Sequence, residues 1–413
     1  MTSDIHVFTS ITSNYLPKAR VLAASVKRAA PEVTFHLVLS DTPPAGFNLD
    51  EEPFDNLLTI DDLDIEDREG WSFSHTVVEL CTAVKGLAVE TLFERYGAQK
   101  VFFFDPDMVV FGRFDELAAA LDTSSVLLTP HQTDPELTDE AIMDNEMASL
   151  QYGVFNLGFV GVRNDGEGRR FSRWWMQRLL SYCYDERHRG LFTDQKWVNL
   201  APCFFDNIRV IRSPAFNVAT WNITRRDVAG TLAGGITVNG EPLGFYHFSG
   251  FDSGAQETML NKYGKDNPTL HEMRAWYIAE CEAQGQQTLG TLPCRFACYD
   301  DDTPITTPER ILYRHRLDLQ QAFPNPFSTA KGGYKNWYRG NVPAESVASA
   351  GDRRGVVIPM DLPAAQVCAD LQDWLRRKAV ISSSSPRRMV FRLAAWVVGI
   401  PARRDPSAAG KMH

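Results

Sequence analysis

The stretch VFFFDPDMVV at residues 101–110 decides the fold class. Its apolar residues form a nearly continuous run, which is typical of a strand buried on both faces of a mostly parallel sheet. Only Asp105, Pro106 and Asp107 interrupt the run. Ligands of such sheets bind at the carboxyl ends of the strands, so we expect the two carboxylates to face a ligand. Two acids spaced i, i+2 around a proline can share one Mg²⁺ or Mn²⁺ ion, whereas the alternative is a solvated turn.

Strand patterns alternate with helix patterns from the N-terminus to about residue 250, which predicts an α/β fold with a doubly wound, mostly parallel sheet. Further expected strands lie at 5–9, 33–39, 125–129, 152–162, 208–211 and 243–250, and the longer expected helices at 16–30, 74–96 and 168–184. After about residue 250 this alternation of strand and helix patterns ends. We expect a catalytic domain at 1–255, a helical and loop extension at 256–345, and a C-terminal tail at 346–413.

Charge and composition exclude several classes of protein. The 413 residues carry a formal net charge of -10, which argues against a nucleic-acid partner. Seven Cys residues, an odd number in a long chain, fit reduced thiols better than a disulfide framework. The start of the sequence does not resemble a signal peptide, and no stretch reaches the roughly 18 apolar residues of a membrane span. We therefore expect a cytoplasmic protein.

A third metal ligand is predicted at His247, which ends an aromatic strand and precedes Ser249 and Gly250. Glycine at 250 lets the backbone approach a phosphate closely. A neutral imidazole completes an Asp/Asp/His set that suits Mn²⁺ well and Mg²⁺ less well. The alternative is a core histidine with satisfied hydrogen bonds.

Four motifs in this order resemble those of GT-A glycosyltransferases, most closely the retaining family 8 type: FFFDPDMVVF at 102–111, FNLGFVGVRN at 155–164, TDQKWVN at 193–199 and FYHFSGF at 245–251. The resemblance covers about residues 5–255. It implies a GT-A, Rossmann-like fold and a nucleotide-diphosphate sugar donor, with a UDP-sugar favoured. It also implies that Mn²⁺ or Mg²⁺, held by Asp105, Asp107 and His247, bridges the donor diphosphate.

The same resemblance implies the residues that bind the donor. Asp194 and Gln195 would lie on the reactive face of the sugar as the catalytic pair. The other predicted nucleotide-sugar-binding residues are Thr9, Ser10, Tyr15, Lys85, Asp105, Asn156, Gly158 and Gly250. Alternatives stay open for three of them: Tyr15 as a surface aromatic, Lys85 as a solvated helix lysine, and Asp194 as the N-cap of a helix.

The expected reaction retains the anomeric configuration and needs no strong enzyme base, because the acceptor hydroxyl can pass its proton to the leaving phosphate. An inverting reaction would need a carboxylate base, for which Asp134, Glu136 and Asp139 are candidates. In one respect the sequence departs from the family, because no lysine closely follows His247. The diphosphate is therefore expected to meet the backbone or another cation such as Lys262 or Lys265.

The resulting functional hypothesis is a metal-dependent glycosyltransferase that acts on a glycan or lipid-linked acceptor in cell-surface polysaccharide or glycan assembly. The alternatives are a nucleotidyltransferase that makes a sugar nucleotide, and a non-catalytic glycan-binding protein. The first would need a Gly-rich, basic loop after the first strand, which residues 9–16 lack. Residues 387–404 mix arginines with apolar residues, so we expect either peripheral contact with the inner face of a membrane or a helix packed on the catalytic domain.

Overall fold

The computed structural model describes residues 4–342, which belong to one compact unit. The predicted tail at 346–413, with its membrane-surface segment at 387–404, lies outside the described residues. Among residues 4–342, none of the helices combines the length and the apolar character that crossing a membrane requires.

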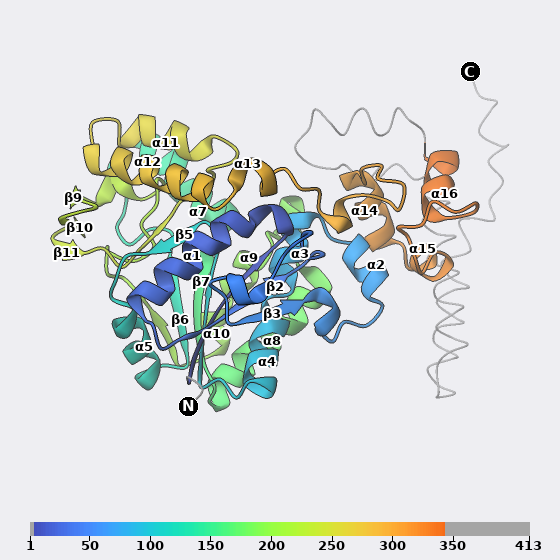
Figure 1. Cartoon of the computed structure of the whole chain (residues 1–413), viewed down its shortest axis with the longest axis horizontal. Helices are drawn as coiled ribbons and strands as arrows, with labels where there is room; N and C mark the ends of the chain where they lie inside the picture. The colour runs from blue at the N-terminus through green and yellow to red at the C-terminus, as the bar shows by residue number, and fades with distance from the viewer. Residues whose placement is uncertain (1–3, 343–413) are drawn as a thin grey trace, which may run out of the picture. The chain divides into compact units, whose positions relative to one another are not determined.

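A seven-stranded sheet forms the centre of this unit, with the strand order β3-β2-β1-β4-β7-β6-β8 (Figure 1). The strands are β1 (Ile5–Ile11), β2 (Thr34–Leu39), β3 (Asn56–Thr59), β4 (Lys100–Phe104), β6 (Val126–Pro130), β7 (Phe155–Arg163) and β8 (Ile208–Val210). Strands β3, β2, β1 and β4 are parallel, β7 runs antiparallel to β4 and β6, and β8 is parallel to β6. The predicted α/β class with a mostly parallel sheet is confirmed.

Helices cover both faces of the sheet, as the run of three phenylalanines predicts. Phe103 packs in one core cluster with helices α4 (Lys85–Arg95) and α8 (Gly166–Tyr182). Phe102 and Phe104 pack on the opposite face with α1 (Leu16–Ala29) and α5 (Phe114–Thr123). Successive side chains of a strand point to opposite faces, so an all-apolar strand needs a helix layer on each side.

The expected helix at 74–96 is two helices, α3 (Val77–Ala83) and α4, with a break at Val84. Thr76 caps α3, because its side chain accepts a hydrogen bond from the Glu79 amide. Other helices before the C-terminal part are α2 (Arg68–Phe73), α6 (Asp139–Ala141), α7 (Met147–Tyr152), α9 (Gln195–Val198) and α10 (Ala201–Phe204).

The contact between α4 and α8 depends on Gly86. A Cβ atom there would lie 2.5 Å from the Met176 Cα atom, so the two helix backbones would have to move apart. We expect Gly86→Ala to lower the free energy of unfolding by about 1–3 kcal/mol in urea denaturation. Gly340→Ala is the matched control, since Gly340 lies on a helix with open space around it and alanine should not destabilise it there. Equal stability of the two variants would contradict this packing.

A second, two-stranded sheet stands beside the main one. The chain turns at residues 105–107 and continues as β5 (Met108–Val110), which pairs antiparallel with β12 (Phe245–His247). The interrupted run at 101–110 is therefore two strands in two sheets rather than one strand with a polar end. A third sheet contains β9 (Val228–Thr231), β10 (Gly235–Val238) and β11 (Glu241–Pro242).

Helices of the C-terminal part pack on the small sheets and on α2 and α3. They are α11 (Ala255–Tyr263), α12 (Pro268–Ala283), α13 (Gln286–Leu289), α14 (Thr307–His315), α15 (Leu317–Ala322) and α16 (Tyr334–Asn341). Met273 and Tyr277 of α12 share a core cluster with Val109 of β5 and Tyr246 of β12. The mainly helical character predicted for this region is confirmed, whereas the domain boundary at residue 255 stays a prediction.

Helix α14 is held by buried charges. The Arg314 guanidinium donates to the Glu79 carboxylate at 2.8 Å, and the same arginine lies 3.5 Å from Glu186. Arg310 donates to the carbonyl oxygens of Phe73 and His75 at 2.9 and 2.7 Å. Burial lowers the pKa of Arg310 to about 10. These contacts fix the loop that leads into α3, and α3 forms one wall of the cleft described next.

Candidate active site

A cleft of about 650 Å³ opens at the carboxyl ends of β1 and β4. The order of the strands reverses here, because β1 has β2 on one side and β4 on the other, and ligands of α/β sheets bind at such a point. Ten of the predicted site residues line the cleft: Ser10, Tyr15, Lys85, Asp105, Asp107, Asn156, Gly158, Asp194, Gln195 and His247. The fold thus gathers residues from distant parts of the sequence.

Thr9 and Gly250, which were also predicted, are not among the residues that line the cleft. Neighbouring side chains of a strand point to opposite faces, so Thr9 and Ser10 cannot both face it. Among the described residues, the buried Ser10 hydroxyl has no hydrogen-bond partner. Gly250 has a φ of 76°, and its carbonyl oxygen accepts from Gln256 N–H at the start of α11. It shapes the turn after His247.

The turn at Asp105, Pro106 and Asp107 is fixed by backbone hydrogen bonds. Met108 N–H donates to the Asp105 carbonyl oxygen at 3.0 Å, which closes a turn with proline in its favoured second position. Asp105 N–H donates to the Gly158 carbonyl of β7 at 2.7 Å. Phe248 N–H, next to His247, donates to the Asp107 carbonyl at 2.8 Å. Both acids are thereby held at the corner between the two sheets.

His247 lies against both acids because β12 pairs with β5 in a register that sets it opposite Met108. Its Nε2 atom is 3.0 Å from Asp107 and 3.9 Å from Asp105. The Nδ1 atom is 3.2 Å from the Asn156 side-chain oxygen, which accepts a hydrogen bond from Nδ1–H. In the neutral ring the Nε2 lone pair then points toward the carboxylates, where it could bind a cation. When the ring is protonated, Nε2–H donates to Asp107 at 3.0 Å instead.

These three side chains fit a divalent cation. One ligand atom of each lies within 4.8 Å of the others, which suits ligands that surround a single ion. Two carboxylates and an imidazole are a donor set for Mn²⁺ or a similar metal. The Asn156 contact supplies the outer hydrogen bond that orients a ligating histidine.

Charge within the cluster follows from its contacts. Desolvation raises the pKa of Asp105, although Lys85 and His247 oppose this shift. Desolvation would also raise the pKa of Asp107, but the neighbouring imidazole outweighs it and the pKa is lowered. Burial disfavours the charged form of His247, but Asp107 and Asp105 outweigh burial and raise its pKa. Asp107 and the imidazole thus each favour the charged form of the other.

Gly158 is required by close approach to the cluster. A Cβ atom at this position would lie 2.8 Å from the Asp105 Oδ2 atom and 2.8 Å from the His247 Cε1 atom. It would also lie 2.5 Å from the end of Met108. Any larger side chain here must displace the cluster.

Lys85 is a buried residue of the site rather than a solvated helix lysine. It is only 4% exposed, and its ammonium donates to Asp194 at 3.0 Å and to the Leu157 carbonyl at 3.0 Å. Asp105 lies 3.6 Å from the same ammonium. Burial opposes the charge of Lys85, but Asp194 and Asp105 outweigh it and raise its pKa. The Lys85 ammonium therefore links Asp105 of the predicted metal site to Asp194 of the predicted catalytic pair.

Asp194 occupies the N-cap position of α9, but its side chain makes no capping hydrogen bond and pairs with Lys85 instead. Its neighbour Thr193 has a φ of 41°, a strained value for a β-branched residue. The side-chain oxygen of Gln195 accepts hydrogen bonds from Leu157 N–H at 3.2 Å and from the Asn156 side-chain amide at 3.4 Å. Both residues of the predicted catalytic pair are thus held in place by their neighbours.

Sequence reasoning missed other residues that line the cleft, among them His131, Tyr152 and Trp221. The His131 Nε2 atom is 3.3 Å from the Asn156 amide, and the Trp221 ring meets the His247 ring edge to face at 5.2 Å. All three lie outside the four motifs. Only the positions of these side chains in the fold could have revealed them.

The acids proposed as a base for inversion do not line the cleft. The Glu136 carboxylate accepts from Asn145 at 2.7 Å and from Thr224 at 2.6 Å, while Asp134 and Asp139 are not lining residues. The segment that follows forms α6, a π-helical turn at Ile142–Glu146, and α7. Asp144 of this turn does line the cleft and pairs with Lys262 at 2.5 Å. Neither Lys262 nor Lys265 lines the cleft.

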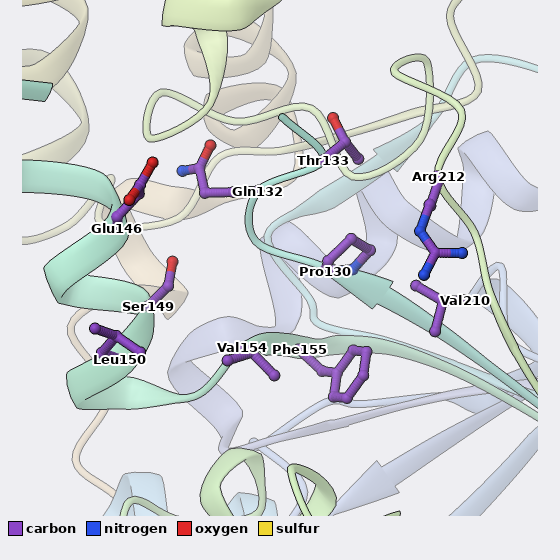
Figure 2. Close-up of a pocket in the computed structure, with 10 residues that line it drawn as sticks. All are labelled: Pro130, Gln132, Thr133, Glu146, Ser149, Leu150, Val154, Phe155, Val210 and Arg212. Carbon is purple, nitrogen blue, oxygen red and sulfur yellow. The ribbon is translucent and has the colours of Figure 1, made fainter. Parts of the chain in front are cut away.

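A second pocket, of about 400 Å³, lies between α7 and the ends of β6 and β8 (Figure 2). Glu146, Ser149 and Leu150 line it from the helix side, with Val210 and Arg212 across from them. Ser149 lines this pocket and also the main cleft, so α7 is a shared wall. Asp105, Asp107 and His247 are not among the residues that line this pocket.

Comparisons with known proteins give similarities of two kinds, and no family model matches the chain. The uncharacterized protein YfnD of Bacillus subtilis (strain 168) is 28% identical over 255 residues, which cover 60% of this chain and 78% of YfnD. The uncharacterized protein YfnF of the same strain is 26% identical over 151 residues, 37% of this chain. That match spans only 47% of YfnF.

Three solved structures are similar to the chain at low sequence identity. The galactosyltransferase LgtC, in complex with donor and acceptor sugar analogs, matches 70% of this chain and 97% of its own, with a TM-score of 0.40 and 16% identity. GlyE of Streptococcus pneumoniae TIGR4 matches 72% and 67%, with a TM-score of 0.39 and 14% identity. A glycosyltransferase involved in glycosylation of the major capsid of PBCV-1 matches 62% and 98%, with a TM-score of 0.35 and 11% identity. All three of these neighbours are glycosyltransferases by name.

Proposed function

We propose that the protein is a metal-dependent glycosyltransferase that moves a sugar from a nucleotide-diphosphate donor, with a UDP-sugar favoured, to a glycan or lipid-linked acceptor. We also propose that it acts in cell-surface polysaccharide or glycan assembly. The observation that carries the proposal is the Asp105, Asp107 and His247 cluster beside Lys85 and Asp194, in a cleft at the carboxyl edge of the sheet. Mn²⁺ or Mg²⁺ held by the cluster would neutralise charge that builds up on the leaving diphosphate.

The other residues of the cleft would position the donor sugar. Asn156 and Gln195 share a hydrogen bond, and further bonds to His247 and to the Tyr152 carbonyl fix both side chains at the place where they would contact the sugar. Asp194 is kept beside Lys85, where its carboxylate can steady positive charge on the anomeric carbon as the sugar is transferred. Stacking of Tyr15 on the nucleotide base stays a prediction.

The carboxylates in the cleft all have partners, which supports a reaction that retains the anomeric configuration. Among the described residues, four carboxylates line it: Asp105 and Asp107 in the cluster, Asp194 on Lys85, and Asp144 on Lys262. Hydrogen bonds from Lys262 and Tyr263 lower the pKa of Asp144, which makes it a weak base. An acceptor hydroxyl that attacks from the side of the leaving group can pass its proton to a phosphate oxygen, and no unpaired carboxylate is then required.

A panel of UDP-, GDP- and dTDP-sugars tests the proposal. We expect one of them to bind and to be hydrolysed slowly in the presence of Mn²⁺, and EDTA to remove the activity. Nuclear magnetic resonance of the released sugar would show the configuration at the anomeric carbon. No response to any donor would refute the proposal, and pyrophosphate release from a nucleoside triphosphate and a sugar phosphate would instead favour a nucleotidyltransferase.

Gly158 supplies a sharper test of the metal site. We expect Gly158→Ala to weaken Mn²⁺ binding about tenfold or more, because the added methyl displaces Asp105 and His247. Calorimetric titration with Mn²⁺ measures this directly. Gly161→Ala is the matched control on the same strand, since its Cβ would meet Phe102 and Leu127 and no ligand of the cluster. Equal Mn²⁺ affinity of the two variants would argue against the cluster as the metal site.

A further inference from the structure

A buried lysine of α1 pairs with one carboxylate among the described residues. Lys18 lies on α1, is 1% exposed, and donates to both oxygens of the Asp252 carboxylate at 2.5 and 2.6 Å. Its ammonium also lies 4.1 Å from the centre of the Tyr15 ring. The Tyr15 hydroxyl donates to the same carboxylate at 2.6 Å. Two donors that reach the cleft region thus converge on one carboxylate.

This carboxylate differs from its donors in its surroundings. The Asp252 side chain is 46% exposed, whereas that of Lys18 is 2% exposed. Asp252 lies on a turn between Gly250 and Gly254, both in the left-handed region with φ of 76° and 75°. The turn starts soon after His247, and Ser249, which directly precedes it, lines the cleft. A fixed, buried cation is therefore matched by an anion on an exposed turn.

The negative charge of the cleft favours a site near Lys18 where a ligand's anion can replace the Asp252 carboxylate. Four aspartates and one lysine line the cleft, so a diphosphate would meet a negative surface before a metal binds. Asp105 and Asp107 together balance the charge of one divalent ion, and Lys85 is already paired with Asp194. Lys18 contacts the ring of Tyr15, which lines the cleft. Its partner Asp252 is partly exposed, whereas Asp194, the partner of Lys85, is buried.

We propose that Lys18 and Tyr15 form an anion subsite that Asp252 occupies in the free protein and that phosphate oxygens of the donor's diphosphate group take over. This rests on the proposed function. The exchange keeps the buried ammonium paired throughout, because one anion replaces another. Asp252 thereby acts as an internal competitor of the donor, and the turn at 250–254 moves when the donor binds.

Calorimetric titration of the full chain with UDP and GDP in the presence of Mn²⁺ tests the subsite. We expect Lys18→Met to weaken binding of the diphosphate about tenfold or more, since a charge-assisted hydrogen bond is lost. We expect Asp252→Asn to tighten it about threefold or more, since the competing anion is removed. Lys27→Met is the control, because Lys27 lies on the same helix and pairs with Asp55 at 2.5 Å away from the cleft.

Each outcome has a distinct meaning. A purely structural clamp between Tyr15, Lys18 and Asp252 predicts weaker binding in both site variants, and that result would overturn the subsite. Binding that neither variant changes would overturn it as well, while the proposed function would stand. Failure of the wild-type chain to bind any nucleoside diphosphate would overturn both proposals. Thermal unfolding of each variant checks that the fold is kept.

Discussion

Replacing Asp107 with alanine is expected to abolish metal-dependent sugar transfer while the fold stays intact. The carboxylate is a ligand of the proposed metal and also the closest partner of His247, at 3.0 Å. Its loss removes one of two charges that balance a divalent ion and frees the imidazole to turn. We expect a fall in kcat of at least about 10³-fold, because charge stabilisation on the leaving diphosphate is lost.

Asp115→Ala is the control for this variant. Asp115 is an exposed acid at the start of α5 and does not line the cleft. Rates at rising Mn²⁺ concentrations separate weaker metal binding from lost chemistry, because only the first is rescued by more metal. Wild-type activity in Asp107→Ala would remove the cluster from the mechanism.

Replacing Lys85 with methionine is expected to cost both stability and activity. The change leaves Asp194 buried without its cation, since that side chain is 3% exposed. Breaking a buried ion pair on one side costs about 3–5 kcal/mol, so we expect a fall of this size in the free energy of unfolding. Urea denaturation measures the fall, and donor turnover should be lost at temperatures where the variant is still folded.

A double variant separates the loss of stability from the loss of activity. Lys85→Met combined with Asp194→Asn leaves no buried charge unpaired, so we expect about 1–3 kcal/mol of stability to return while activity stays lost. Lys27→Met is the exposed counterpart, because its pair with Asp55 is 27% and 42% exposed and should change stability by less than about 1 kcal/mol. If the single and double variants were equally unstable, the ion pair would not be the reason.

Sequence alone predicted the main sheet and its two helix layers, because Phe102, Phe103 and Phe104 need apolar partners on both faces. It did not predict that β5 leaves this sheet for β12. That pairing is antiparallel and joins segments far apart in the sequence, and no local pattern records such a contact. The break at Val84 was also missed, since both halves of the expected helix carry the same helical periodicity.

For the candidate site, the sequence predicted residues that belong to recognisable motifs. It did not predict properties that depend on contacts with residues distant in the sequence. Asp105, Asp107 and His247 come together as expected. Lys85 gave no signal of burial in its own segment, because Asp194 and the Leu157 carbonyl that hold it lie on other elements. Lys262 was expected near the diphosphate, yet it does not line the cleft and pairs with Glu140 and Asp144. Lys18 was overlooked because its partner Asp252 is distant in sequence.

Pairing of β5 with β12 also sets the order in which the protein can mature. Both aspartates leave the ribosome long before His247, and β5 has no strand partner until β12 has been synthesised. Domains tend to fold as their segments emerge during translation, so the nascent chain can begin its main sheet while the corner at 105–107 is still open. Assembly of the cluster would then be a late step of biogenesis, and chains that stop short of β12 would lack its histidine.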